Sequence, residues 1–131
     1  FIALFFTEIN IKNPLMTLFV IIMTAGVFSL AGLINAIFAK KFDDIAVIPS
    51  FVLAPLTYLG GVFYTVSLLP EFWQTLSRFN PILYMINSMR YSVIGISDVS
   101  IQNALMMIVV FFILLFAIAV ILLKKGIGIR Q

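Results

Sequence analysis

Three long stretches of the chain contain no charged residue and set its organisation. They cover residues 14–39, 45–68 and 99–123, and each exceeds the roughly 20 apolar residues that a helix needs to cross a bilayer. Short polar or charged segments separate them. The pattern predicts an all-helical integral membrane protein with three complete transmembrane helices. Residues 1–6 are also apolar and are interpreted as the end of another span.

The segment between the last two stretches, residues 70–96, is too polar for an ordinary span and too apolar for an exposed loop. Pro70 and Pro81 each suit the first position of a helix. The residue before a proline is biased away from helical geometry, so Asn80 should separate two short helices. Two such helices between full spans predict a broken re-entrant hairpin, which enters the bilayer and returns.

The first long stretch carries small residues on one side of a helix. They follow one another at spacings of three, three and four: Gly26, Ser29, Gly32 and Ala36. In lipid, such a stripe lets another helix approach closely. Ordinary use of glycine in membrane helices is the alternative explanation.

The second long stretch is interrupted by Pro49 and Pro55 and is rich in hydroxyl groups. Interior prolines kink a helix and free carbonyls, which neighbouring side chains or water must satisfy. Such a span suits the interior of a protein better than a lipid-facing position. Three of its residues are candidates for contact with a transported molecule: Thr57, Tyr58 and Tyr64. Helix–helix packing, or an aromatic belt in the case of Tyr64, would explain them equally well.

Composition supports the membrane interpretation and excludes several chemistries. Of 131 residues, 63% are hydrophobic and 10% are charged, against about half and about a quarter in a soluble domain. The absence of Cys and His removes thiol nucleophiles, imidazole bases and conventional zinc sites. Asp43 and Asp44 have no neighbouring ligand, so we interpret them as a solvated turn that caps the next helix, rather than as an acid/base or metal site. We predict no cofactor and no metal.

The basic residues lie at the ends of the apolar stretches, so the net charge of +3 does not indicate nucleic-acid binding. Cytoplasmic segments of membrane proteins are enriched in Lys and Arg. The preferred orientation therefore puts five basic residues in the cytoplasm: Lys40, Lys41, Lys124, Lys125 and Arg130. The C-terminus is then cytoplasmic, and the re-entrant hairpin lies in the outer half of the bilayer.

Arg90 lies in the second short helix of the re-entrant segment, one turn after Asn87. A charged side chain at membrane depth is costly, so we predict that Arg90 has a partner. The candidates are Asp98, Glu71 and carbonyls at a helix end. The alternative is that the side chain extends to the outer headgroups.

The same short helix is amphipathic. One face is polar, with Asn80, Tyr84, Asn87 and Tyr91. This division indicates one side against protein and one toward water or headgroups, and a helix lying in the interface would show it too. We assign an outer gate to the re-entrant residues Pro70, Asn80, Pro81, Tyr84, Asn87 and Arg90. Trp73 is interpreted as an interfacial anchor.

Several residues also form a spaced pattern: Leu53, Leu56, Leu59, Gly60, Val62 and Leu69-Pro70, then, after ten residues, Pro81-Ile82, Tyr84 and Arg90. The pattern resembles the signature of the ABC transporter type-2 permease family, the membrane subunits of bacterial exporters of drugs, lipids and polysaccharides. The resemblance implies that residues 1–131 are the C-terminal part of a single six-span transmembrane domain. The family's broken helices would correspond to Glu71–Phe79 and Ile82–Ile94.

The resemblance also implies partners, namely a second permease copy in a homodimer and two cytoplasmic ATP-binding subunits. The chain has no phosphate-binding Gly-x-x-x-x-Gly-Lys-Ser/Thr loop, so the partner would hydrolyse ATP and the chain is not itself an enzyme. No carboxylate lies inside a full span, which disfavours a proton-coupled carrier. We predict a permease subunit of an ATP-driven exporter in the bacterial inner membrane, in contact with lipid. A non-transporting assembly or scaffold subunit is the alternative, and a drug, a lipid or a lipid-linked sugar could be the cargo.

Overall fold

The computed structural model describes residues 11–126, without the side chain of Phe42, and all regular structure in this range is helical. The elements are α1 (Pro14–Phe38), α2 (Phe42–Ile48), the π-helix η2 (Pro49–Leu53), α3 (Ala54–Leu59), the 3-10 helix η3 (Val66–Leu68), α4 (Glu71–Arg78), α5 (Pro81–Ile94) and α6 (Ile101–Lys124). The predicted all-helical class is therefore confirmed for these residues. The span end predicted at residues 1–6 lies outside them.

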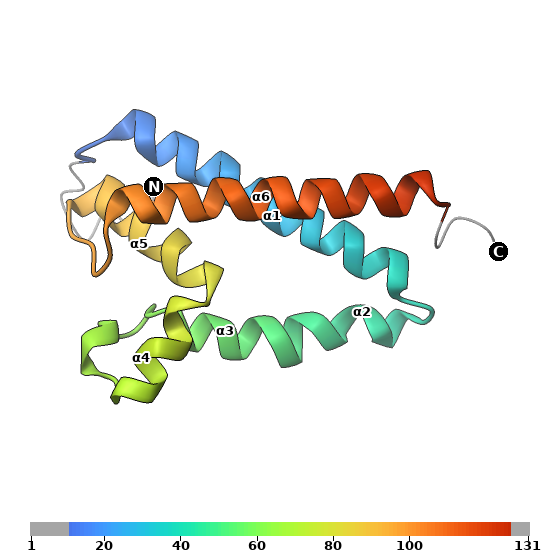
Figure 1. Ribbon diagram of the computed structural model, residues 1–131, viewed down its shortest axis with the longest axis horizontal. Coiled ribbons are helices and arrows are strands. Elements are labelled where there is room, and N and C mark those ends of the chain that lie inside the picture. The colour runs from blue at the N-terminus through green and yellow to red at the C-terminus, as the bar shows by residue number, and fades with distance from the viewer. Residues whose placement is uncertain (1–10, 127–131) are drawn as a thin grey trace, which may run out of the picture.

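Helices α1, α5 and α6 pack into a bundle (Figure 1). α1 and α6 cross, and α5 packs against both of them. One buried side chain from each helix forms the core: Val27, Met85 and Ile108. The segment before α1 also joins the bundle, because the N–H of Asn13 donates to the carbonyl of Ser92 in α5 over 3.0 Å.

The lengths and apolar compositions of α1 and α6 suit membrane-crossing helices. They confirm helices over the predicted stretches 14–39 and 99–123, and many of their large apolar side chains are exposed. The small-residue stripe of α1 meets α6 at Gly26, where an added Cβ would lie 2.6 Å from Cε2 of Phe112. Further along, a Cβ on Gly32 would meet no described atom within 4 Å. The stripe therefore supports close packing at one point and then turns away from the bundle.

Together α2, η2 and α3 form a helical rod, Phe42–Leu59, which we call the arm. The arm runs apart from the bundle along most of its length in Figure 1. Its start is capped by Asp44, whose carboxylate accepts the N–H groups of Lys40 at 3.0 Å and Lys41 at 2.9 Å. The prediction of a capping turn is thereby confirmed for Asp44.

The arm is shorter than the helix predicted over residues 45–68, because Gly60 and Gly61 follow Leu59 and end it. Gly61 has a φ of 76°, a left-handed conformation that suits glycine. Upstream, the rod widens into π-turns, with the N–H of Ala54 bonded to the carbonyl of Pro49 five residues back. A membrane crossing by residues 45–68 stays a prediction.

Residues 70–96 fold as two helices, as predicted. α4 ends at Arg78, and α5 begins at Pro81. Between them, Asn80 caps α5, since its Oδ1 accepts the N–H of Ile82 at 3.0 Å. At the other end, Gly95 stops α5 in the left-handed conformation, with a φ of 81°. Entry of these helices into a membrane stays a prediction.

Candidate functional site

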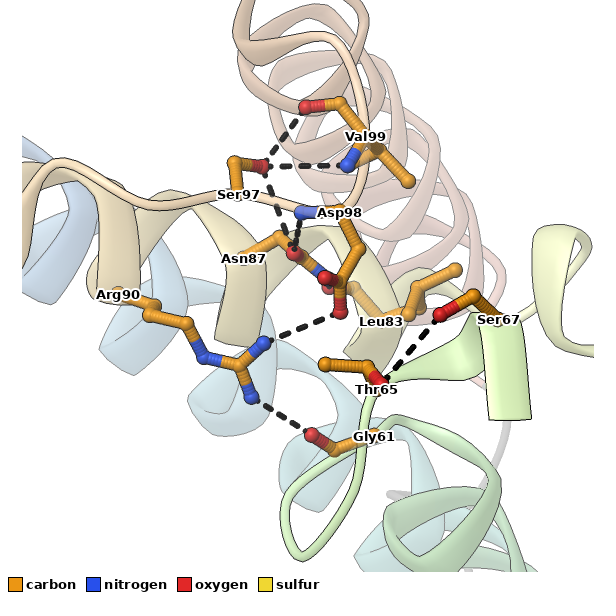
Figure 2. A network of polar contacts seen from close by, with 9 residues as sticks. All are labelled: Gly61, Thr65, Ser67, Leu83, Asn87, Arg90, Ser97, Asp98 and Val99. Carbon is orange, nitrogen blue, oxygen red and sulfur yellow. Dashed lines mark hydrogen bonds and ion pairs between the residues drawn. The ribbon is translucent and has the colours of Figure 1, made fainter. Parts of the chain in front are cut away.

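Arg90 joins three separate segments of the chain. It projects from α5, where Nη1 donates to Oδ2 of Asp98 over 3.1 Å and Nη2 donates to the carbonyl of Gly61 over 2.8 Å (Figure 2). The side chains of Arg90 and Asp98 are 22% and 19% exposed, so water screens the pair only in part. The prediction that Arg90 has a partner is confirmed for Asp98 and for a carbonyl beyond a helix end.

Asn87 lies one turn before Arg90 and is fully buried. Its Oδ1 accepts the backbone N–H of Asp98 at 2.8 Å, and its Nδ2 donates to the carbonyl of Leu83 at 2.9 Å. Ser97 shapes the same loop, since its hydroxyl donates to the carbonyl of Val99 at 2.7 Å. Asp98 is therefore held through its backbone by Asn87 and through its carboxylate by Arg90 (Figure 2). We call Gly61, Asn87, Arg90 and Asp98 the Arg90 network.

Asn80 connects the end of the arm to the start of α5. Besides capping α5, its Nδ2 donates to the carbonyl of Leu56 in α3. The side chain is 2% exposed. Next to it, an added Cβ on Gly60 would lie 2.9 Å from Cδ1 of Ile86, so the backbone of Gly60 packs directly against side chains of α5. The arm thus rests on α5 through Asn80, Gly60 and the Arg90 network.

The remaining predicted gate residues lie at the junctions of α4. The carbonyl of Pro70 accepts the N–H groups of Trp73 at 2.9 Å and Gln74 at 3.1 Å, which begins α4. The hydroxyl of Tyr84 donates to the carbonyl of Arg78 at 2.7 Å, where α4 ends. Four of the six gate candidates, Asn80, Tyr84, Asn87 and Arg90, therefore hold α3, α4, α5 and the loop before α6 together, and Pro70 and Pro81 stand at the starts of α4 and α5. A gating role stays a prediction.

The polar face of α5 is not solvated as the sequence pattern suggested. Asn80 and Asn87 are buried and hydrogen-bonded within the protein, and Tyr84 and Tyr91 are half-buried. This correction has a clear physical reason. Asn80 satisfies a carbonyl and an N–H group at helix ends, and Asn87 satisfies the N–H of Asp98 in the loop before α6; buried away from water, these groups need partners within the protein.

The three candidates for cargo contact lie on the arm and on the turn that follows it. Thr57 donates its hydroxyl to the carbonyl of Leu53 in its own helix at 2.7 Å. Tyr64 donates to the carbonyl of Tyr58 at 2.6 Å, which brings these two residues together. The side chain of Tyr58 is itself exposed. Contact of these residues with a transported molecule stays a prediction.

A cavity of about 260 Å³ lies beside the Arg90 network, and polar side chains of Gln74, Arg78 and Asp98 help to line it. A larger, apolar cavity of about 440 Å³ lies between α1 and α5. Within residues 11–126, no group of three or more His, Cys, Asp or Glu side chains is arranged to hold a metal ion. The candidate site therefore consists of hydrogen-bonded junctions between helices and of cavities beside them.

Two residues that take part in hydrogen bonds between segments were not predicted from the sequence. Gly61 supplies a carbonyl to Arg90, and the Gly60–Gly61 pair was the available signal, since paired glycines commonly end a helix. Asn35, inside α1, is 8% exposed and donates to the carbonyl of Ile45 at 2.9 Å. An amide within an otherwise apolar stretch was the signal there.

A family model described as ABC-2 type transporter matches residues 1–94. The chain belongs to this family. The matched residues of the ABC-2 chain include α1, the arm, α4 and α5, and therefore every residue of the Arg90 network except Asp98. The resemblance inferred from the spaced Leu-Pro, Pro-x-x-Tyr and Arg pattern is confirmed.

Curated relatives of the ABC-2 chain include the inner membrane transport permease YadH of Escherichia coli (strain K12). It is 48% identical over 130 residues, which are 99% of this chain and 51% of the relative, and YadH of Shigella flexneri gives the same values. Nodulation protein J of Rhizobium leguminosarum bv. trifolii is 25% identical over 106 residues, 81% of this chain and 40% of the relative. The ABC-2 chain thus spans about half the length of the YadH relatives it matches. No solved structure gives a significant match.

Proposed function

We propose that this ABC-2 chain is the C-terminal part of a permease subunit of an ATP-driven exporter in a bacterial inner membrane. The family match over residues 1–94 carries the proposal. The 48% identity to an inner membrane transport permease over nearly the whole chain supports it. The permease would form the substrate pathway and outer gate, while a separate ATP-binding subunit hydrolyses ATP and the permease itself is not an enzyme.

The proposed topology has three crossings, made by α1, residues 45–68 and α6, with α4 and α5 re-entering from the outer side. The arrangement in Figure 1 supports it, because α1 and α6 run in one direction and the arm returns in the other. The turn between α1 and α2 therefore lies at the same end of the molecule as the end of α6, and both carry lysines. This shared end is the proposed cytoplasmic side.

Exposed aromatic side chains support an interfacial position for α4. Phe72, Trp73 and Phe79 are 71%, 43% and 77% exposed, and the rings of Phe72 and Trp73 meet edge to face at 5.4 Å. Large exposed aromatic groups are costly in water and favourable at the boundary between headgroups and hydrocarbon. Membrane lipid is therefore a proposed partner of this helix.

In the proposed mechanism, two permease copies alternately expose a cavity to either side of the membrane. Tyr58, Tyr64 and Thr57 on and after the arm would line the pathway. Movement of the arm relative to α5 would have to break or rearrange the bonds from Asn80 to Leu56 and from Arg90 to Gly61. These bonds make the junction a suitable outer gate, because they join the arm to the helices of the re-entrant hairpin.

Co-purification tests the proposal. The full-length permease, co-expressed with a candidate soluble ATP-binding subunit from the same organism, is expected to yield a stable complex. After reconstitution, its ATP hydrolysis should rise with a transported cargo, and a partner lacking its phosphate-binding lysine should give no transport. A stable complex that moves none of a panel of drugs, lipids and lipid-linked sugars would instead favour the scaffold alternative.

The orientation has its own test. Cysteine placed at Lys125 is expected to resist a membrane-impermeant thiol reagent in intact cells and to react after the cells are opened. Cysteine at Ser67, an exposed residue at the opposite end of the molecule, should react in intact cells. Labelling of Lys125→Cys from outside would reverse the proposed topology.

A further inference from the structure

The carbonyl of Ile45 in α2 is deprived of its normal partner by the sequence. In an α-helix this carbonyl would accept the N–H of the residue four positions later, which is Pro49 and has no N–H. Asn35 of α1 fills the gap, since its Nδ2 donates to the Ile45 carbonyl at 2.9 Å. The bond from Asn35 therefore replaces one that the helix cannot make.

The bond is also the main polar tie between the start of the arm and the bundle. Within residues 11–126 it is the one hydrogen bond that connects α1 to the arm. Packing does not hold the two together tightly, because a cavity of about 260 Å³ separates them, lined by Asn35, Phe38, Ala39, Asp44, Val47 and Ile48. Asn35 is 8% exposed and spans this loosely filled junction.

The opposite end of the arm is held in the same way. Asn80 donates to the carbonyl of Leu56, whose helical partner is lost where α3 tightens and ends, and Arg90 donates to the carbonyl of Gly61 beyond that end. At both ends, then, a bundle-side donor binds a backbone carbonyl that a break in the helix has freed. At the first end, Pro49 leaves the carbonyl of Ile45 without a helical partner, and Asn35 donates to it.

We infer that Asn35 is a positioning residue, which fixes the start of the arm against α1 through the carbonyl that Pro49 leaves free. Its importance to transport rests on the proposed function, in which the arm lines the pathway, but its effect on the position of the arm does not. Asn35 touches no proposed cargo residue and acts through the arm that carries Thr57, Tyr58 and the turn to Tyr64.

The test combines Asn35→Leu and Pro49→Ala in the full-length permease. Cysteines at Phe38 and Val47, which line the junction cavity, report the position of the arm through cross-linking by a short thiol-reactive reagent in membranes. Asn35→Leu should lower the initial cross-linking rate about fivefold, the population change expected from one hydrogen bond. Pro49→Ala alone should lower the rate as well, because the N–H of alanine would take the Ile45 carbonyl within the helix and Asn35 would lose its acceptor.

The double variant decides between positioning and simple space-filling. Asn35→Leu added to Pro49→Ala should leave the cross-linking rate within about twofold of Pro49→Ala alone, because the bond from Asn35 to the arm is already lost in that background. Equal losses in both backgrounds, or no loss in either, would overturn the inference. The readout needs no cargo or ATP, so a failed transport assay would count against the proposed function and leave this result intact.

Discussion

Arg90→Leu is expected to lower the free energy of unfolding of the full-length permease by about 3 kcal/mol, as measured by thermal or denaturant unfolding in detergent. The loss comes from two groups left without their donor, the carboxylate of Asp98 and the carbonyl of Gly61. An acid whose side chain is 19% exposed is costly to leave unpaired. Since the bonds join α5, the turn after α3 and the loop before α6, transport should fall with stability.

Three variants make the Arg90 result specific. Arg90→Lys should give an intermediate loss. The guanidinium reaches two separate acceptors with its planar fork of N–H groups, whereas the ammonium group of lysine is a single compact donor. Arg90→Leu combined with Asp98→Asn should lose less than the sum of the single changes, by about 1–2 kcal/mol of coupling. Arg78→Leu is the matched control, since Arg78 is exposed and forms no ion pair within the described residues. Equal effects at Arg90 and Arg78 would show that the network is not stabilising.

The helices of the bundle were predictable because their signal is local and long. α1 and α6 each come from an uncharged run longer than a bilayer requires, and Pro14 marks the start of the first. The break at Asn80 and Pro81 was predictable for a similar reason, since an asparagine often caps a helix and a proline is favoured at its first position.

The end of the arm was not predicted, because the apolar pattern continues past the point where the helix stops. Residues up to Leu68 read as one span, yet the Gly60–Gly61 pair ends the rod at Leu59. Hydropathy measures the tendency of a segment to leave water and says little about its backbone conformation. Two adjacent glycines end the helix even within an apolar stretch, because they lower helix propensity and allow a positive φ.

The site was predictable where charge alone demanded a partner. A guanidinium near membrane depth needs an anion or carbonyls, and Asp98 was the nearest acid in sequence. The carbonyls of Gly61, Leu56 and Ile45 were beyond reach, since every residue has one and only the tertiary fold brings a donor to it. For the same reason the polar face of α5 was expected to meet water or headgroups, although its amides serve buried backbone groups.

Gly26→Leu is the second substitution with a large expected effect, a loss of about 2–3 kcal/mol in the unfolding of the full-length permease. A Cβ at Gly26 would lie 2.6 Å from Cε2 of Phe112, so the longer side chain must push α1 from α6 where the bundle core is built. Phe112→Ala added to Gly26→Leu should recover about half of the loss by making room. Gly32→Leu is the matched control on the same stripe, because a Cβ there meets no described atom within 4 Å and should change stability by less than about 0.5 kcal/mol. If the two leucine variants unfold alike, close approach at Gly26 does not hold α1 to α6.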